Sequence, residues 1–327
     1  MRKSRWLRRD HGQDVDEPLV FAGSASVELT RRICEHLGTP VGRGELLRFS
    51  EGTLFPRVLE NVRGRSVYVV QSTAYPANDN FMELLFWLDA FTRASAASVT
   101  AVIPYFAYAK GDKKDEPRVS IRARVCADAI EIAGADRVVA MDLHAPQIQG
   151  FFHVPVDDLY AMPYLCEALH GYGLSDPVIV SPDAGFAKKA RRFASRMHAP
   201  LAIADKMRTG HDEHAEVTEV IGEVAGRDAI LVDDFTVSAG TLVEAASELT
   251  ARGARRVVAA VSHAALAPGA LAALKESPIE RLFVTDTIET SPEPYDGSIE
   301  VVSVAPLFAE AIKRIHHRES ISSLFDD

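Results

Sequence analysis

Cysteine is scarce in this 327-residue chain, and its three cysteines stand far apart. Cys34, Cys126 and Cys166 have neither CxxC spacing nor histidines at metal-ligand intervals, which argues against structural zinc. We therefore expect three free, buried thiols in a reducing compartment.

Long apolar runs are also lacking, so no segment is expected to cross a bilayer. The basic start, MRKSRWLRRD, has no hydrophobic stretch of the kind that a secretory signal requires, and we interpret residues 1–18 as a charged extension. An excess of positive charge is missing too: the net charge is −10, which argues against a general nucleic-acid or anionic-membrane surface. The predicted location is the cytoplasm, with no nucleic-acid or membrane partner.

Several common enzyme motifs are absent. The sequence contains no Walker GxxxxGK[ST] motif, no GxGxxG in a βαβ unit and no GxSxG elbow. The sequence therefore argues against four classes of enzyme: P-loop kinases, P-loop GTPases, dinucleotide dehydrogenases and α/β-hydrolases.

The sequence does contain short apolar, β-branched runs that alternate with amphipathic stretches of helical length. Such runs are typical of strands buried on both faces, and the alternation indicates βαβ units with parallel sheets. The predicted strands are Ser66–Gln71, Val99–Pro104, Arg137–Met141, Pro177–Val180, Ala229–Val232, Val257–Val261 and Leu282–Thr285. Helices predicted near Met82–Arg93 and Leu242–Arg252 occupy equivalent places in the two halves. We predict an α/β protein with mainly parallel sheets and two domains, residues 19–157 and 158–307, that pack closely.

The most informative segment is ILVDDFTVSAGT, residues 230–241. An apolar run ends in Asp233 and Asp234, and small residues then open a helix. Small residues let backbone N–H groups approach a phosphate, and the helix N-terminus adds positive charge. The two carboxylates would then hold another part of the ligand, such as ribose hydroxyls. An ordinary strand-to-helix turn with a capping residue is the alternative.

Two further clusters follow predicted strands. In MDLHAPQIQGFF, residues 141–152, Asp142 and His144 share a face and could contact a metal or a triphosphate. In VSPDAGFAKKA, residues 180–190, Asp183 precedes a helix that carries Lys188 and Lys189. A core histidine and a helix-capping aspartate are the alternatives. Because ligands of parallel sheets bind beyond the carboxyl ends of the strands, the clusters are expected at one edge.

Two cationic segments also follow predicted strands. Residues 203–214, IADKMRTGHDEH, carry Lys206 and Arg208. Residues 105–124 carry Lys110, Lys113, Lys114, Arg118, Arg122 and Arg124. Either segment by itself could be an ordinary charged, solvent-exposed loop. Two such segments in an acidic protein favour a polyphosphate substrate, over which a mobile loop closes.

Taken together, these segments resemble the ribose-phosphate pyrophosphokinases, or phosphoribosyl pyrophosphate synthetases. The resemblance runs from about Leu19 to the C-terminus. It is carried, in order, by FAGSAS (Phe21–Ser26), RFSEG (Arg48–Gly52), ENVRG (Glu60–Gly64), QSTAYPANDNFMELL (Gln71–Leu85), AVIPYFAYA (Ala101–Ala109), MDLHAPQIQGFF, SPDAG (Ser181–Gly185), GRDAILVDD (Gly226–Asp234) and AEAIKRIHHRESISSLF (Ala309–Phe325).

The resemblance implies two domains of the type I phosphoribosyltransferase fold and a C-terminal segment, residues 308–327, that returns to the first domain. It also implies a homo-oligomer built from dimers, commonly a hexamer, with ATP sites shared between subunits. The implied enzyme is a transferase, a ribose-phosphate diphosphokinase. With Mg²⁺ it moves the β,γ-diphosphoryl group of ATP to the C1 hydroxyl of ribose 5-phosphate and releases AMP.

Position by position, the resemblance also implies roles for single residues. The catalytic residues would be Lys206 and Arg208, and the metal ligands His144 and Asp183, with Asp142 beside the first. The ATP-binding residues would be Phe49, Glu51, Thr53, Lys110, Gly111, Asp112 and His144. The ribose 5-phosphate-binding residues would be Asp233, Asp234, Val237, Ser238, Ala239, Gly240 and Thr241.

Three positions depart from the family pattern. Thr53 follows RFSEG where an acid is usual, Lys110-Gly111 replaces the usual Arg-Gln, and Val237 replaces a usual Asp. A lysine keeps the charge but lacks the planar fork of arginine. The segment Asp112–Ser120 is also shorter than in the phosphate-activated, ADP-inhibited class. We expect weakened ADP inhibition, relaxed nucleotide choice and little dependence on free phosphate.

Two other functions fit parts of the pattern. A non-catalytic, regulatory relative of the synthetase would keep the fold but lose active-site groups, whereas this chain retains Lys206, Arg208 and the acid pair. A phosphoribosyltransferase would share the fold and the acid-pair loop, but it offers no obvious place for Arg48–Gly52 or Gln71–Asn80.

Overall fold

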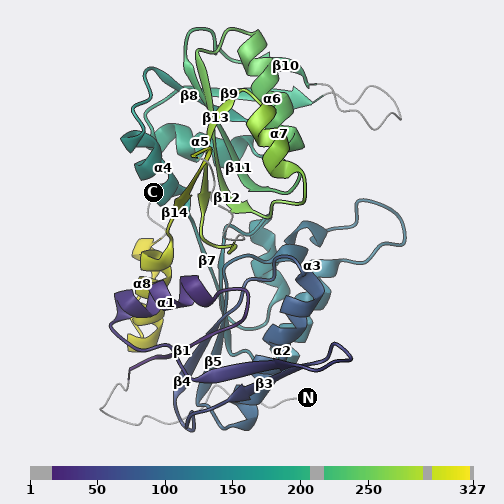
Figure 1. Ribbon diagram of the computed structural model, residues 1–327, viewed down its shortest axis with the longest axis vertical. Coiled ribbons are helices and arrows are strands. Elements are labelled where there is room, and N and C mark those ends of the chain that lie inside the picture. Colours follow the sequence, from purple (N-terminus) through teal and green to yellow (C-terminus); the bar gives the residue numbers. More distant parts are fainter. Residues whose placement is uncertain (1–16, 207–216, 290–296, 325–327) are drawn as a thin grey trace.

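The structure, a computed structural model, describes residues 17–206, 217–289 and 297–324. Two α/β domains are stacked along the long axis of the molecule, with the first domain at the bottom of Figure 1. The predicted α/β fold with mainly parallel sheets is confirmed. Most of the predicted N-terminal extension lies outside the described residues.

The first domain is built on a parallel sheet of five strands in the order β1-β4-β5-β6-β7. The strands are β1 (Leu19–Ala22), β4 (Ser66–Val70), β5 (Ser98–Ile103), β6 (Arg137–Met141) and β7 (Val156–Leu159). Helices α2 (Ala77–Arg93) and α3 (Arg122–Ala133) cover one face, and α1 (Val27–Leu37) and α8 (Ala305–His317) cover the other. The short 3₁₀ helices η1 (Ala107–Gly111) and η2 (Pro146–Phe151) follow β5 and β6.

The central strands are apolar along their length because helices bury both of their faces. In β4, Val67 and Val69 pack with α2 and α3, whereas Tyr68 and Val70 pack on the opposite side with α1 and α8. This arrangement explains why continuous apolar runs, rather than alternating ones, marked these strands in the sequence.

The second domain contains a sheet of seven strands in the order β10-β9-β8-β11-β12-β13-β14, in which only the β9–β10 pair is antiparallel. The strands are β8 (Pro177–Ser181), β9 (Leu201–Lys206), β10 (Val217–Ile221), β11 (Asp228–Thr236), β12 (Arg256–Ala264), β13 (Ile279–Thr285) and β14 (Ile299–Val302). Helices α4 (Met162–Gly171) and α5 (Ala187–Arg196) pack on one face, and α6 (Gly240–Ala251) and α7 (Ala270–Glu276) on the other.

A separate antiparallel hairpin of β2 (Gly44–Arg48) and β3 (Leu54–Val58) lies against α2 in the first domain. A Cβ atom added to Gly44 would come within 2.7 Å of the Trp87 ring, so glycine permits this close approach. The N–H of Phe49 donates to the carbonyl of Thr53 at 2.9 Å and closes the turn of the hairpin.

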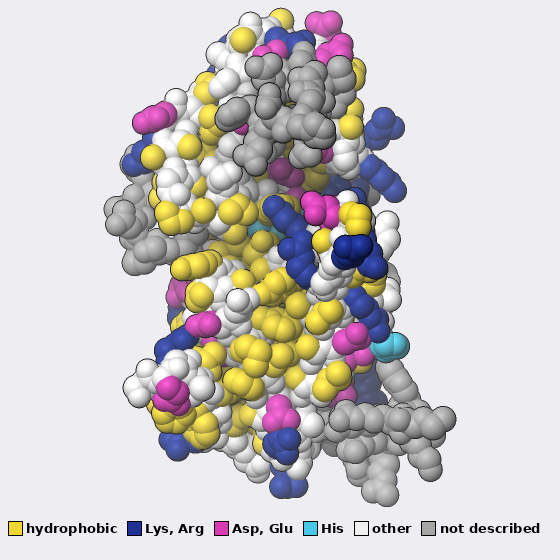
Figure 2. All heavy atoms as spheres, turned by 90° about the vertical axis from the view of Figure 1, so that its right-hand side faces the viewer, with side chains coloured by type: hydrophobic (Ala, Val, Ile, Leu, Met, Phe, Trp, Pro, Cys, Tyr) yellow, Lys and Arg dark blue, Asp and Glu magenta, His cyan; other side chains and the backbone are white. Residues whose placement is uncertain are grey.

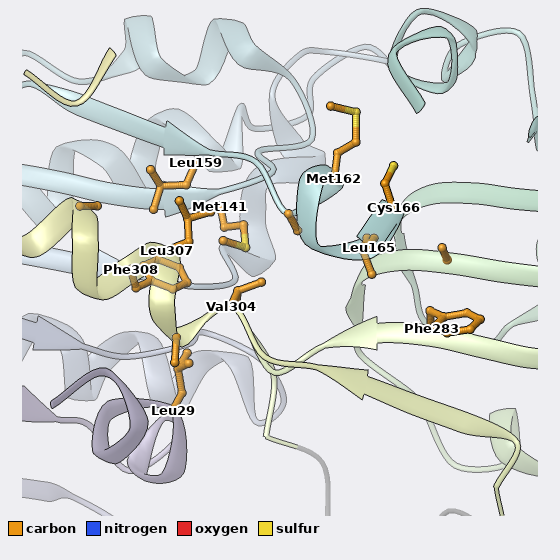
Figure 3. Packing of buried hydrophobic residues seen from close by; sticks show 14 of the residues in the cluster. Leu29, Met141, Leu159, Met162, Leu165, Cys166, Phe283, Val304, Leu307 and Phe308 are labelled. Atoms are coloured by element: carbon orange, nitrogen blue, oxygen red, sulfur yellow. The ribbon is translucent and has the colours of Figure 1, made fainter. Parts of the chain in front are cut away.

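One hydrophobic core crosses the boundary between the domains (Figure 3). Leu29 of α1, Met141 of β6 and Phe308 of α8 belong to the same buried cluster as Leu165 of α4 and Phe283 of β13. The two sheets are therefore joined through packed side chains and not only through the chain that connects them.

Two elements of the structure extend across the predicted domain bounds. The boundary after residue 157 falls inside β7, which pairs with β6 as far as Leu159 and so belongs to the first sheet. The C-terminal segment, placed at residue 308, begins as a helix at Ala305, because Pro306 fits the first turn and Ala305 is already buried. This helix, α8, packs against α1 of the first domain, and η3 (Ser322–Leu324) follows it.

The three cysteines are free and buried, as expected. Burial raises the pKa of the Cys34 and Cys126 thiols to about 11 and that of Cys166 to about 12. Among the described residues, no helix has the length and apolar character needed to span a membrane.

Phe308→Ala is expected to lower the free energy of unfolding by about 3–5 kcal/mol. The Phe308 ring is fully buried in the core that joins the two domains, so its removal leaves a cavity where α8 meets the first sheet. Denaturant unfolding measures the change, with Val301→Ala as the control, since Val301 is 44% exposed. Equal losses in the two variants would contradict the role given to α8.

Candidate active site

Polar side chains from both domains meet at the edge where the strands of the two sheets end. Asp142 and His144 follow β6, Asp183 follows β8, and β11 carries Asp233 and Asp234 near its end. Beside them lies a cavity of about 460 Å³. Its polar lining consists of Asp142, His144, Gln147, Asp158, Tyr160, Lys188, Lys189, Arg192, Asp233, Asp234 and Ser262. Ligands of open α/β sheets bind at this edge, so the cavity is the candidate active site.

A charged network joins the domains across the cavity. His144 Nδ1, from the first domain, lies 3.0 Å from Asp234 Oδ2 of the second domain. Lys189 Nζ donates to the same oxygen at 3.3 Å, and to the carbonyls of Leu143 at 3.1 Å and His144 at 3.2 Å. A carboxylate on one ring nitrogen orients an imidazole and leaves the other nitrogen for a ligand. His144 is thus held in place but remains 42% exposed.

The neighbouring acids on β11 have opposite pKa shifts. Burial, and then the negative charge of Asp234, raises the pKa of Asp233 well above its usual value, and Asp183 adds to the effect. Burial also opposes ionisation of Asp234, but His144 and Lys189 outweigh it and lower its pKa. A pKa raised in this way is typical of a carboxyl group at a functional site.

The structure gives Asp142 a connecting role. Its Oδ2 atom accepts hydrogen bonds from the Ala161 N–H at 3.0 Å and from the Ser262 hydroxyl. These bonds tie the end of β6 to the start of α4 and to β12, and Asp142 itself has a left-handed φ of +44°. This oxygen is already engaged inside the protein.

Asp183 is exposed at the turn between β8 and α5. Its Oδ1 atom accepts the Phe186 N–H at 2.8 Å, so the capping interpretation holds for one oxygen. The Ser181 hydroxyl donates to the Asp183 carbonyl at 2.7 Å and fixes the same turn. The negative charge of Asp183 also makes a small contribution to the raised pKa of Asp233.

The donors at this edge suit a metal that is shared with a phosphate. Within residues 17–206, 217–289 and 297–324, no three His, Cys, Asp or Glu side chains converge on one point as a closed metal site would require. Mg²⁺ keeps several waters and usually takes one or two carboxylates together with substrate phosphates. The exposed carboxylate of Asp183 and the exposed side of the His144 ring are the groups that fit that mode of binding.

The predicted phosphate loop lies between β11 and α6. Its turn consists of Val237, Ser238 and Ala239, and Ala239 has a left-handed φ of +62°. The Gly240 N–H lies 3.3 Å from the Ser238 hydroxyl, and α6 begins at Gly240 and Thr241. N–H groups in the first turn of a helix lack intrahelical acceptors and bind anions. The turn is therefore a candidate anion site.

The cationic residues predicted to act on the phosphates are only partly described. Lys110 and Gly111 end η1, Asp112 follows it, and the Lys110 ammonium lies 3.5 Å from the centroid of the Phe235 ring at the cavity edge. Lys206 is the last residue of β9, which corrects the expectation of a loop from residue 203. The side chain of Lys206 and all of Arg208 lie outside the described residues.

The other predicted ATP residues are not at the cavity of their own chain. Phe49, Glu51 and Thr53 occupy the turn of the β2–β3 hairpin, which projects from the first domain (Figure 1), and none lines the cavity. The Thr53 hydroxyl donates to Glu51 at 2.8 Å, and the Phe49 ring, 47% exposed, lies 6.0 Å from that of Phe55.

Three residues at the site were not predicted to act there. The sequence identified Lys189 only as one of two lysines at the start of a predicted helix and gave no indication of its contact with Asp234. Asp158 is buried at the cavity, accepts the Leu143 N–H at 3.0 Å and has its pKa raised to about 7 by burial. Phe235 looked like an ordinary strand residue. The contacts of Lys189 and Phe235 depend on how the domains meet, which no local sequence signal reports.

Paired acids, a candidate anion loop and cations at the carboxyl edge of two parallel sheets are typical of a phosphate-handling enzyme that binds a sugar phosphate. The family model described as the N-terminal domain of ribose phosphate pyrophosphokinase matches residues 19–134. The model of the phosphoribosyl synthetase-associated domain matches residues 211–326. The chain belongs to the ribose-phosphate pyrophosphokinase family.

Individual relatives agree over nearly the whole chain. A ribose-phosphate pyrophosphokinase of Caldanaerobacter subterraneus is 50% identical over 307 residues, which are 94% of this chain and 97% of the relative. One of Rhizobium meliloti is 46% identical, over 94% of this chain and 99% of its own length. The crystal structure of phosphoribosylpyrophosphate synthetase from Mycobacterium smegmatis matches with a TM-score of 0.87 and 35% identity, over 93% of this chain and 100% of that one. The predicted fold, family and transferase activity are confirmed.

Proposed function

We propose that the interdomain cavity is where this chain carries out the family reaction. In that reaction the β,γ-diphosphoryl group of ATP passes to the C1 hydroxyl of ribose 5-phosphate, and AMP leaves. The observation that supports this assignment most strongly is the His144–Asp234–Lys189 network, because it places phosphate-side and ribose-side groups within hydrogen-bond reach of each other.

The ribose side is assigned to β11 and the turn that follows it. Asp233 and Asp234 would accept hydrogen bonds from the ribose hydroxyls, in addition to the Asp234 N–H that Asp233 Oδ1 already accepts at 2.8 Å. The N–H groups and hydroxyls of residues 237–241 bind the 5-phosphate at the start of α6. The sugar phosphate is thereby bound at both its hydroxyls and its 5-phosphate, with its C1 hydroxyl toward the cavity.

The phosphate side is assigned to His144, Asp183 and the cationic segments. His144 and Asp183 would hold Mg²⁺, with Asp142 beside them. When bound, the ion would neutralise charge on the transferring phosphates. Lys110, Lys206 and Arg208 add positive charge around the same phosphates, which is the main way in which proteins catalyse phosphoryl transfer.

A product-resolved assay tests the assignment. Purified protein with ATP, ribose 5-phosphate and Mg²⁺ should release AMP and phosphoribosyl pyrophosphate in equal amounts. Release of no AMP would favour the non-catalytic relative. Release of pyrophosphate from phosphoribosyl pyrophosphate and a nucleobase would favour a phosphoribosyltransferase.

The hairpin and the neighbouring helices support a homo-oligomer built from dimers. Figure 2 shows apolar side chains gathered over the first-domain half of one face. The large exposed apolar side chains on the β2–β3 hairpin and its end, on α2 and on α3 are Leu47, Phe49, Phe55, Leu59, Met82, Phe86, Val125 and Ile132. We infer that a second copy covers them and that the hairpin serves the ATP site of that copy. Light scattering of the purified protein should report at least a dimer and contradicts the inference if it finds a monomer.

Phe49→Ala is expected to raise the KM for ATP about tenfold while kcat changes much less. The exposed ring at the hairpin turn is the stacking surface available to an adenine base, and it is remote from the reacting phosphates. Steady-state kinetics at saturating ribose 5-phosphate measures both constants, with Val301→Ala as the control. An unchanged KM for ATP would remove the hairpin from the site.

ADP is expected to inhibit weakly, and activity should need little free phosphate. Thr53 offers no acid at the hairpin, and Lys110 offers a point charge in place of a bidentate fork. Several nucleoside triphosphates should therefore support turnover, which an AMP-release assay extended to other nucleoside monophosphate products can measure. Saturating inhibition by low ADP would contradict the expectation.

The three free thiols suit a cytoplasmic enzyme.

A further inference from the structure

One aromatic ring at the cavity edge contacts functional groups from both sides of the proposed reaction. Phe235 follows the acid pair on β11, and its ring is half-buried. The Lys110 ammonium lies 3.5 Å from the ring centroid, and the His144 ring lies 5.8 Å away at an interplanar angle of 75°. Lys110 and His144 belong to the first domain, whereas Phe235 belongs to the second.

The ring is an unusual partner for a lysine placed so near two carboxylates. Burial lowers the pKa of Lys110, and the charges of Asp234 and Asp233 oppose that shift without cancelling it. A carboxylate partner would neutralise the ammonium. The face of an aromatic ring holds a cation by its quadrupole and leaves the positive charge available to a phosphate.

We propose that Phe235 is a positioning residue that holds Lys110 and His144 against the phosphates of the nucleotide. This role rests on the function proposed above. Lys110 stands where the family usually has an arginine, and a lysine on a flexible stem has no planar fork to fix its direction. The ring supplies that direction from the opposite domain. Its edge contact with His144 restrains the same imidazole that Asp234 holds through Nδ1.

The experiment compares the kinetics of five variants with those of the wild-type enzyme: Phe235→Leu, Phe235→Tyr, Lys110→Met, the Phe235→Leu/Lys110→Met double variant and the control Tyr172→Leu. The control removes a ring that also lies under cations, 5.1 Å from Arg256 and 5.0 Å from Arg281, but that does not line the cavity. Kinetic constants for ATP and for ribose 5-phosphate are measured separately.

Phe235→Leu should lower kcat/KM for ATP about tenfold, with a smaller change in the KM for ribose 5-phosphate. Phe235→Tyr should restore most of the loss because it restores the ring. The double variant should be little worse than Lys110→Met alone, since the two residues act as one unit. The control should stay within about twofold of the wild-type enzyme.

Three results would overturn the role: losses that multiply in the double variant, no recovery with tyrosine, or equal effects of Phe235→Leu and the control. If Phe235→Leu fails to fold, the comparison of Phe235→Tyr with Lys110→Met decides, because only the second should lose affinity for ATP. If the wild-type enzyme makes phosphoribosyl pyrophosphate and Phe235→Leu has unchanged kinetic constants, only the positioning role is rejected. A wild-type enzyme that makes none rejects the function and this role with it.

Discussion

Asp233→Asn is expected to stabilise the ligand-free protein at neutral pH while it lowers kcat by about 100-fold or more. The pKa of Asp233 is raised in the folded protein, so folding is opposed wherever the carboxyl is ionised in the unfolded chain. This cost grows as the pH rises above the usual aspartate pKa of 3.8 and is absent below it. Asparagine removes the charge and keeps an oxygen for the Asp234 N–H, which bonds Asp233 Oδ1 at 2.8 Å.

Asp234→Asn provides the matched opposite case. The pKa of Asp234 is lowered to about 2, so its ionised form stabilises the folded protein above pH 3.8, and this stabilisation is lost as the pH falls toward 2. Replacing it leaves Lys189 and His144 without their charged acceptor and should cost about 1.5–3 kcal/mol at pH 7. Turnover should fall as steeply as in Asp233→Asn, because both carboxylates are assigned to the ribose hydroxyls.

Denaturant unfolding between pH 4 and 8, with EDTA and without nucleotide, separates the two variants. The stability gain of Asp233→Asn should shrink toward pH 4, and Asp234→Asn should be the less stable protein at pH 7. The assignment of the acid pair fails if either variant retains near-wild-type kcat. The electrostatic account fails if Asp233→Asn is destabilised at neutral pH.

The parts of the fold that were predictable are those whose burial leaves a local signature. Strands such as β5 and β6 are covered on both faces, so their sequences read as continuous apolar runs. The hairpin and β10 carry alternating or polar residues at edges, so no such run marks them. The predicted boundary after residue 157 lies inside β7 for the same reason, because Asp157 and Asp158 interrupt the apolar character of this strand.

The position of the candidate site was predictable because parallel strands present their carboxyl ends at one edge. That rule places the acid pair of β11 and the residues after β6 and β8 at the ends of their sheets. It does not say that Asp234 would meet His144, 90 residues away, or that Lys189 would join them. Those contacts depend on the docking of two sheets through a shared core, and core packing between domains has no periodicity that a single sequence reveals.

Lys206→Ala is expected to lower kcat by several orders of magnitude, the largest effect of a single substitution in this enzyme. Lys206 ends β9, a parallel neighbour of β8, so its backbone leaves the sheet at the same edge as Asp183. A cation at this edge stabilises the transition state more than the bound substrates, because negative charge spreads over the transferring phosphoryl group in the transition state. The KM values for both substrates should therefore change far less than kcat.

Lys206→Arg and Lys313→Ala complete this experiment. Arginine keeps the charge but changes its shape, so it should restore only part of the rate. Lys313 is an exposed residue of α8, outside the cavity, and its loss should leave kcat within about twofold. Single-turnover mixing of enzyme, Mg²⁺, ATP and ribose 5-phosphate would place the defect in the chemical step. A Lys206→Ala enzyme with a normal single-turnover rate would show that the positive charge catalysing diphosphoryl transfer comes from elsewhere, with Lys110 the next group to test.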